Sequence, residues 1–413
     1  MAIEDQAVPE SLYRNAINLN RYQTSVSKKL INRYNDIIVE LTNELRNTDI
    51  ELTAARQLRI STILRQLEES LGTWAIDATN VTKDELQGLA ALQSDFIQEQ
   101  LKKVLPSDEM KSAVRTVEIS PQFAQSVVTT DPARVNVFTL PEELQATRTG
   151  IEPKFSLTAR EGAIITLPNG ATVQTSFRRI AASQHELLSK TVNNGLLIGR
   201  TTQEISKELR GRLDFEEVGT LASIKQKGGV ATKLANNQIE TIVRTSINQV
   251  SNSAAIAVYR NNSDITDRYR YVATLDTRTS PICSRLDGQV FTYGKGPTPP
   301  QHFNCRSTTV PLVKEAFLKR FGVTQEDFEE GAQRPSKTGL AQKGKMVPAN
   351  ENYASWLSKQ PSEIQDEVFG KKKGVIYRSQ LRKKDPTTVL REFVRSDGSE
   401  LTLEELGRLN NAT

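Results

Sequence analysis

The sequence predicts a helix-rich α+β protein: an N-terminal helical bundle, a β-hairpin-bearing middle, and a small mixed α/β module with a basic helical tail. Three observations support this prediction. Apolar residues recur at helical spacing through the first hundred residues. An Asn-Gly pair, Asn169-Gly170, lies between two short β-type runs. Two further β-type runs, 270–275 and 308–313, flank the segment that contains both cysteines.

The first hundred residues predict three helices that pack together. Along three stretches, spacings of three and four place the apolar residues on one side of a helix. Thr82 and Glu85 have the spacing of a capping box, so we expect the third helix to begin there. Short joins predict an antiparallel bundle over 1–105, with the stripes forming its core rather than an exposed groove for a partner. The stripes are Val26, Leu30, Tyr34, Ile37, Leu41 and Leu45; Ile60, Ile63, Leu64, Leu67 and Leu71; and Leu86, Leu89, Leu92, Phe96 and Leu101.

The middle of the chain predicts a linker followed by a hairpin and helices. Prolines interrupt any long helix over 106–160, which we interpret as linker or irregular packing. Within 161–230, the runs 163–166 and 172–175 flank the Asn-Gly turn and predict a β-hairpin. We expect a helix from about Phe177 to Asn194, and a second helix that a capping box of Thr201 and Glu204 opens and that ends by Gly211.

The remaining chain predicts a module over 231–320 and a tail over 321–413. The module would contain a long amphipathic helix through Ile239 and Val258, ending near Asn261-Asn262, and then the two β-type runs 270–275 and 308–313. The tail would contain a helical stretch from Trp356 to Phe369, a basic segment, and a closing helix over 403–409.

Composition excludes several classes of protein. Apolar residues make up 37% and charged residues 25% of the 413, as in soluble proteins, and no apolar run approaches the roughly 18 residues that span a bilayer. Residues 1–10 show no signal peptide, so we expect the protein to stay in the compartment where it is made. That compartment is reducing, and two cysteines in 413 residues do not indicate a disulfide scaffold.

The basic tail has two interpretations. Between Ala341 and Arg395 there are 12 Lys and Arg against 6 Asp and Glu, an excess far above the chain's average. This excess is typical either of a solvated tail or of a surface that contacts the phosphates of DNA. The candidate DNA contacts are Lys371, Lys372, Lys373, Arg378, Arg382, Lys383 and Lys384.

Both cysteines and one of the two histidines fall within 23 residues, at Cys283, His302 and Cys305. These are soft ligands of the kind that zinc prefers, and Asp276, Asp287 or a water molecule would supply the fourth ligand. A hydrogen-bonded packing network of Asp276, Thr279, His302 and Arg306 is the main alternative. A third interpretation is nucleophilic catalysis by one cysteine that His302 activates. The residues alone leave all three open.

The same segment resembles the Mu F-like phage head morphogenesis family, also described as phage minor head proteins. Its hallmark is an Asp, then Thr-Ser and Cys, a Leu-x-Gly, and Pro-Pro-x-His-x-x-Cys-Arg before a strand. Here these are Asp276, Thr279, Ser280, Cys283, Leu286, Gly288, Pro299, Pro300, His302, Cys305 and Arg306. The resemblance extends over roughly 195–406, although the usual Arg-Thr-Glu is Arg244-Thr245-Ser246 in this chain.

The resemblance implies a structural protein present in a few copies near the portal vertex of the virion. It implies contacts with the portal protein and with the major capsid or scaffolding protein, and roles in procapsid assembly, DNA packaging or DNA ejection. Members of the family are generally not enzymes, so we expect no catalytic activity. The alternatives are a metal-dependent enzyme acting on nucleic acid or a host protein, which would use Cys283, His302, Cys305 and Asp276, and a DNA-binding ejection protein.

Overall fold

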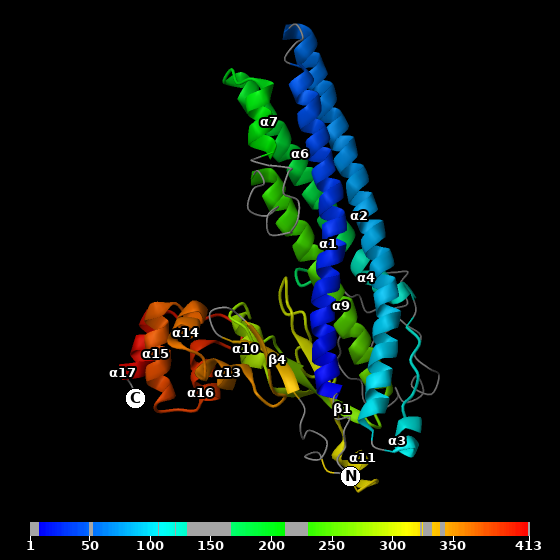
Figure 1. Cartoon of the computed structure of the whole chain (residues 1–413), viewed down its shortest axis with the longest axis vertical. Coiled ribbons are helices and arrows are strands. Elements are labelled where there is room, and N and C mark those ends of the chain that lie inside the picture. Colours follow the sequence, from blue (N-terminus) through cyan, green and yellow to red (C-terminus); the bar gives the residue numbers. More distant parts are fainter. Residues whose placement is uncertain are drawn as a thin grey trace.

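The computed structural model of the chain describes residues 8–48, 53–105, 107–119, 121–129, 167–210, 230–322, 324, 333–338 and 343–411. Helices dominate these residues, and the strands form small antiparallel sheets, which confirms the helix-rich α+β class. Figure 1 shows an elongated helical body with a separate lobe, formed by the C-terminal helices, at one side of it.

Two long helices form the N-terminal region, where the sequence predicted three. Helix α1 spans Val8–Asn47 and α2 spans Thr53–Val104. The predicted break before Thr82 is wrong. No proline lies within α2, and Thr82 lies in the middle of this helix with its side chain buried in the protein. Glu85 does not cap a helix; its carboxylate accepts hydrogen bonds from Tyr22 and, at 2.8 Å, from Lys29, both on α1.

The helical body has one continuous apolar core. Helices α6 (Val173–Leu197), α7 (Thr202–Arg210) and α9 (Val230–Asn261) pack against α1 and α2. Trp74 of α2 contacts Tyr34 of α1 and Phe177 of α6 edge-on, with ring centroids 5.5 and 5.7 Å apart. The indole of Trp74 donates to the carbonyl of Leu30 at 3.2 Å, so the buried polar atom of this side chain is satisfied.

The second arm of the predicted hairpin is a helix and not a strand. A turn does form at Asn169-Gly170, where Gly170 has a φ of 76°. Thr172 then caps a helix, because its hydroxyl accepts the backbone N–H of Thr175 at 3.2 Å and α6 begins at once, four residues before Phe177. The first arm, 163–166, lies outside the described residues.

Other short elements surround the body. The second capping box is confirmed: Thr201 N–H donates to Glu204 at 2.9 Å, and Glu204 N–H donates to the Thr201 hydroxyl at 3.2 Å. Within 106–160 the structure describes 107–119 and 121–129. These residues hold α3 (Asp108–Ser112), a 3-10 turn η2 (Pro121–Ala124) and α4 (Gln125–Val128), which pack on α2.

A three-stranded antiparallel sheet packs against α9. It has the order β2-β1-β3, with β1 at Thr266–Val272, β2 at Val290–Thr292 and β3 at Thr308–Val313. The third strand has the predicted bounds, whereas β1 begins four residues before the predicted start. The short helices α10 (Pro281–Leu286) and α11 (Glu315–Lys319) follow β1 and β3.

The C-terminal lobe has its own apolar core around Trp356, Tyr377 and Phe393. The predicted helix from Trp356 to Phe369 is two helices, because Pro361 interrupts it. The closing helix is confirmed and extends to Asn411. The elements are β4 (Gln333–Thr338), β5 (Lys343–Pro348), α13 (Tyr353–Ser358), α14 (Ser362–Phe369), α15 (Lys371–Leu381), α16 (Pro386–Phe393) and α17 (Leu403–Asn411).

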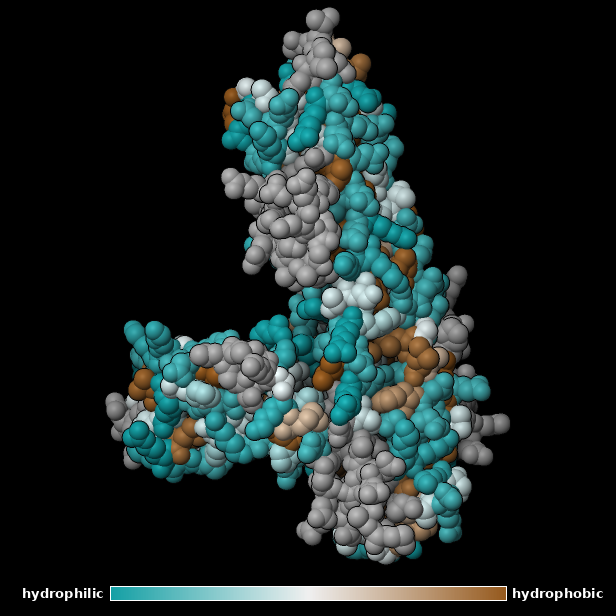
Figure 2. Space-filling model, viewed as in Figure 1, coloured by the Kyte–Doolittle hydropathy of each residue, from teal (hydrophilic) through white to brown (hydrophobic). Residues whose placement is uncertain are grey.

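One face of the molecule is mainly polar among the residues that the structure describes. On the face shown in Figure 2, hydrophilic residues predominate and apolar ones occur in small, separate groups. Among the described helices, none has both the length and the apolar character needed to cross a membrane.

Candidate metal centre

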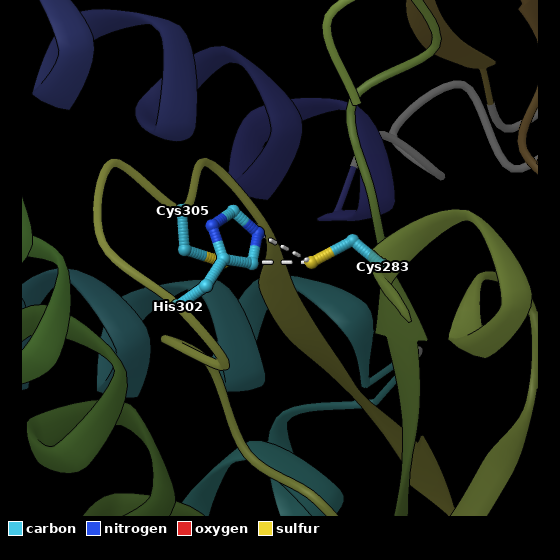
Figure 3. A group of neighbouring side chains, drawn as sticks. All are labelled: Cys283, His302 and Cys305. Carbon is cyan, nitrogen blue, oxygen red and sulfur yellow. Dashed lines mark hydrogen bonds between the residues drawn. The ribbon is translucent and has the colours of Figure 1, made fainter. Parts of the chain in front are cut away.

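Cys283, His302 and Cys305 meet beside the three-stranded sheet. Cys283 lies in α10, and the other two lie in the loop between β2 and β3. The two sulfurs are 3.7 Å apart, and Cys283 Sγ is 3.3 Å from His302 Nε2. Figure 3 shows the imidazole and both thiols directed toward one another. Among the described residues, this is the group of His, Cys, Asp and Glu whose ligand atoms all lie within 4.8 Å of one another.

The start of α10 fixes Cys283. Ser280 has extended backbone geometry and caps the helix, with its hydroxyl accepting the N–H of Cys283 at 3.4 Å. Pro281 occupies the first helical turn, where its missing N–H costs nothing. The hydroxyl of Tyr271, on β1, lies 3.2 Å from Cys283 Sγ, so strand and helix both contact this sulfur.

Helix α9 holds the loop that carries His302 and Cys305. Asn304 has a φ of 59°, and its N–H donates to the Thr245 hydroxyl at 3.0 Å. Its side-chain amide donates to the Thr241 hydroxyl, also at 3.0 Å, and Asn248 donates to the carbonyl of Ser307 at 3.2 Å. Thr241, Thr245 and Asn248 are separated by four and three residues, so they form a polar stripe on one face of α9. The sequence analysis missed this stripe, although its spacing is visible in the sequence.

The imidazole of His302 is oriented by a backbone carbonyl. Nδ1 lies 2.7 Å from the carbonyl oxygen of Phe303, which can only accept, so the proton is assigned to Nδ1. The Nε2 atom therefore presents a lone pair, and it lies 2.6 Å from the hydroxyl of Ser280. This is the arrangement in which a histidine serves as a metal ligand through Nε2.

The two thiols differ in acidity. The hydrogen bond that the Cys283 thiol donates lowers the pKa of Cys305 to about 6, although burial opposes this shift. The same hydrogen bond, together with burial, raises the pKa of Cys283 to about 12. The pKa of His302 is raised, mainly because its imidazole contacts the Cys283 sulfur. The hydrogen bond between the two thiols thus makes Cys305 the more acidic of the pair.

Asp276 lies outside this group. Its buried carboxylate accepts two hydrogen bonds from Arg306, at 2.6 and 2.7 Å, and one from the Thr279 hydroxyl at 3.2 Å. Burial by itself would raise the pKa of Asp276, but the hydrogen bonds and charge of Arg306 lower it. Asp276, Thr279 and Arg306 therefore form a hydrogen-bonded network next to the cysteines, whereas His302 faces the thiols.

Asp287 is also engaged elsewhere. Its carboxylate forms a buried ion pair with Arg334 at 3.1 Å and accepts the N–H of Ala273 at 2.6 Å. The neighbouring Gly288 has a φ of 79°, and a Cβ there would lie 3.1 Å from Asn352 Cβ. A glycine is required at this motif position because the backbone is left-handed and approaches the C-terminal lobe closely.

The seven basic candidate residues fall into two sets. Three are held by acidic side chains: Lys373 by Glu400, Arg378 by Asp366 and Lys384 by Glu392, at 2.7 to 2.8 Å. The other four are exposed. Two lie at the start of α15 and two just beyond its end: Lys371, Lys372, Arg382 and Lys383.

The comparison with known families identifies the segment that contains the candidate metal centre. Residues 186–310 match a family model described as Phage Mu protein F like protein. The match confirms the resemblance indicated by the motif from Asp276 to Arg306, and it suggests a phage head morphogenesis protein. The matched segment runs from α6 into β3 and includes Cys283, His302 and Cys305. Comparison with curated proteins and with solved structures gave no match.

Proposed function

We propose that this protein is a minor capsid protein of a tailed bacteriophage that acts near the portal vertex in procapsid assembly, DNA packaging or DNA ejection. The match of residues 186–310 to the Mu F-like family carries the proposal. The family implies association with the virion.

The form of the molecule supports a role in protein contacts. Helices α1 and α2 have 40 and 52 residues, so they are about 60 and 78 Å long at a rise of roughly 1.5 Å per residue. A rod of this length with a lobe at its side offers separate surfaces to the portal protein and to the major capsid or scaffolding protein (Figure 1). Leu197 and Ile198, at the end of α6, are 83% and 68% exposed and adjacent, as in a contact surface.

The motif residues support a structural rather than a catalytic role. Two buried carboxylates near the cysteines, Asp276 and Asp287, form ion pairs with Arg306 and Arg334 inside the fold, as expected of groups that hold structure together. The hydrogen bonds of Asn304 and Ser307 hold a loop against α9. These contacts stabilise the fold of the module around the cysteines.

Co-expression with the portal and capsid proteins of the same phage tests the proposal. We expect the chain to co-purify with the portal protein and to be found in mature virions by mass spectrometry. Exchanging both Leu197 and Ile198 for Asp should reduce this association, whereas Leu58→Asp, a 72% exposed position on α2, is the matched control. A chain absent from virions that binds neither protein would overturn the proposal.

Contact with packaged DNA is a second candidate function, which the exposure of Lys371, Lys372, Arg382 and Lys383 favours. These four cations extend from a compact lobe, where phosphates can approach them. Ejection with the DNA would use the same surface. The salt dependence of DNA binding tests this second function.

A further inference from the structure

We propose that Cys283, His302 and Cys305 bind one Zn²⁺ ion, with water as the fourth ligand, and that this ion fastens helix α10 to the loop before β3. The inference does not depend on the proposed function, since it concerns how the module is held together. It rests on the separation of the ligand atoms, the orientation of the imidazole and the partners of the nearby carboxylates.

The separations suit tetrahedral zinc. Zinc–sulfur bonds of about 2.3 Å at the tetrahedral angle place two sulfurs about 3.8 Å apart, and zinc–nitrogen bonds of about 2.0 Å place sulfur and nitrogen about 3.5 Å apart. The corresponding separations here are 3.7 Å between the sulfurs and 3.3 Å between Cys283 Sγ and His302 Nε2. Two of the three separations therefore lie within a few tenths of an ångström of the tetrahedral values. The third, between Cys305 Sγ and the imidazole nitrogen, is within 4.8 Å, so a side-chain movement of up to about 1.3 Å closes the group around one ion.

The hydrogen bond of the other ring nitrogen of His302 matches that of a zinc-binding histidine. Such a histidine nearly always donates its other ring N–H to a carboxylate or a backbone carbonyl, which fixes the ring and directs the remaining lone pair at the metal. His302 has this arrangement, with Nδ1 at 2.7 Å from the carbonyl oxygen of Phe303. The two sulfurs are buried, so bulk water does not compete for the ion there.

Water is the fourth ligand because the carboxylates near the group are engaged by arginines. Asp276 is paired with Arg306 and Asp287 with Arg334, and the described residues supply only three ligands of these types. Two hydroxyls lie beside the group: Ser280 Oγ at 2.6 Å from His302 Nε2, and the Tyr271 hydroxyl at 3.2 Å from Cys283 Sγ. They are the hydrogen-bond partners that a zinc-bound water would have.

The ion would stabilise a segment that lacks regular structure. Between the end of β2 at Thr292 and the start of β3 at Thr308, the chain forms turns and bends without a helix or strand. Zinc binding to His302 and Cys305 joins this loop to Cys283 on α10. Because the three ligands converge only in the folded module, binding contributes directly to its stability.

The first test is metal analysis of the full-length chain, purified under reducing conditions without a metal-affinity step. We expect one zinc per chain by elemental mass spectrometry. A chelator should remove it, lower the melting temperature and make two thiols reactive toward a thiol reagent. Replacing zinc with Co²⁺ should give the intense visible bands of a tetrahedral site and the near-ultraviolet absorption of thiolate–cobalt bonds.

Variants separate the ligands from other residues. His302→Ala and Cys305→Ser should lose the zinc, whereas His302→Cys should retain it because a third thiolate replaces the imidazole. His185→Ala changes the other histidine of the chain, on α6, and should bind zinc as the unaltered protein does. Should His302→Ala fail to fold, the His302→Cys variant and the Co²⁺ spectrum still decide the question.

Three results would overturn the proposal. One is a folded, fully reduced chain that contains no zinc and takes up neither Zn²⁺ nor Co²⁺. Another is a metal-free chain in which Cys283 and Cys305 form a disulfide in freshly lysed cells, which would make them an oxidised thiol pair. Zinc that persists when each cysteine is changed to serine would place the ion elsewhere and would also contradict this assignment.

Discussion

Asp287 and Arg334 form a buried ion pair that connects the Mu F-like segment to the C-terminal lobe. The carboxylate and the guanidinium are joined by two hydrogen bonds of 3.1 Å, and their side chains are 0% and 2% exposed. Asp287 also accepts the backbone N–H of Tyr353 at 2.6 Å, while Arg334 donates to the carbonyl of Glu351 at 2.8 Å. One pair thus joins the segment after α10, the hairpin β4–β5 and the start of α13.

We expect Arg334→Met to destabilise the protein strongly. Removing one partner leaves the Asp287 carboxylate buried without its counter-charge, which typically costs about 3–5 kcal/mol. Urea unfolding followed by circular dichroism measures this loss. Arg408→Gln is the matched control, because its ion pair with Glu404 is 76% exposed on both sides and should contribute little. Equal effects of the two substitutions would show that the buried pair does not hold the lobe.

The helices were largely predictable from the sequence because their apolar residues repeat at a fixed local spacing. The spacing does not reveal where one helix ends and the next begins. Thr82 and Glu85 have the pattern of a cap, yet Glu85 contacts α1, and that contact cannot be read from neighbouring residues. At Thr172 the sequence predicted a strand, whereas this threonine caps the start of α6.

The grouping of Cys283, His302 and Cys305 was predictable because all three lie close together in the sequence. The residues that hold these three side chains and their loop in place were harder to predict. The polar stripe of α9 lies some 60 residues before the loop that it holds, and Arg334 is 47 residues from Asp287. Pairs this far apart become neighbours only through the packing of helices and strands, which a single sequence does not specify.

Thr245→Val should loosen the loop that carries His302 and Cys305. The hydroxyl of Thr245 accepts the N–H of Asn304 at 3.0 Å, and valine keeps the shape but leaves that N–H without its partner, at a cost of about 1–3 kcal/mol. We expect a lower melting temperature and weaker zinc binding in a competition with a chelator. Thr191→Val is the control, because its hydroxyl donates only within α6, to Leu187. Unchanged zinc affinity in Thr245→Val would show that the polar stripe of α9 does not position the zinc ligands.

The ion pair of Asp276 should make stability depend on pH. Its pKa is lowered in the folded protein, because Arg306 outweighs the effect of burial. The stabilisation is therefore present above the ordinary pKa of aspartate, about 3.9, and is lost as the pH falls through the lower folded value. Asp276→Asn should be clearly less stable than the unaltered chain at pH 7, and the difference should narrow below about pH 4. A difference in unfolding free energy that stays constant over this range would contradict the assignment.

Two glycines should respond oppositely to alanine. In α2, Gly72 is exposed and has open space where a Cβ would lie, so Gly72→Ala should stabilise the helix by about 0.5–1 kcal/mol. In α6, a Cβ at Gly195 would lie 2.6 Å from Ile205 Cγ1 of α7, so Gly195→Ala should destabilise by about 1–3 kcal/mol. Chemical unfolding of both variants checks the pair. A stabilising Gly195→Ala would mean that α7 does not pack on α6 in this way.

Changing the four exposed cations of the C-terminal lobe should weaken DNA binding if this surface contacts packaged DNA. We expect the quadruple change of Lys371, Lys372, Arg382 and Lys383 to glutamine to lower the affinity for duplex DNA. Each lost phosphate contact should flatten the dependence of log affinity on log salt by about 0.9. The control removes four exposed cations of α1 by the same exchange, Arg21, Lys28, Arg33 and Arg46, so that the net charge is matched. If both variants lose affinity equally, binding follows net charge alone and the lobe has no DNA surface of its own. If the unaltered chain shows no salt-dependent binding, the DNA contact is excluded and the role in protein assembly remains.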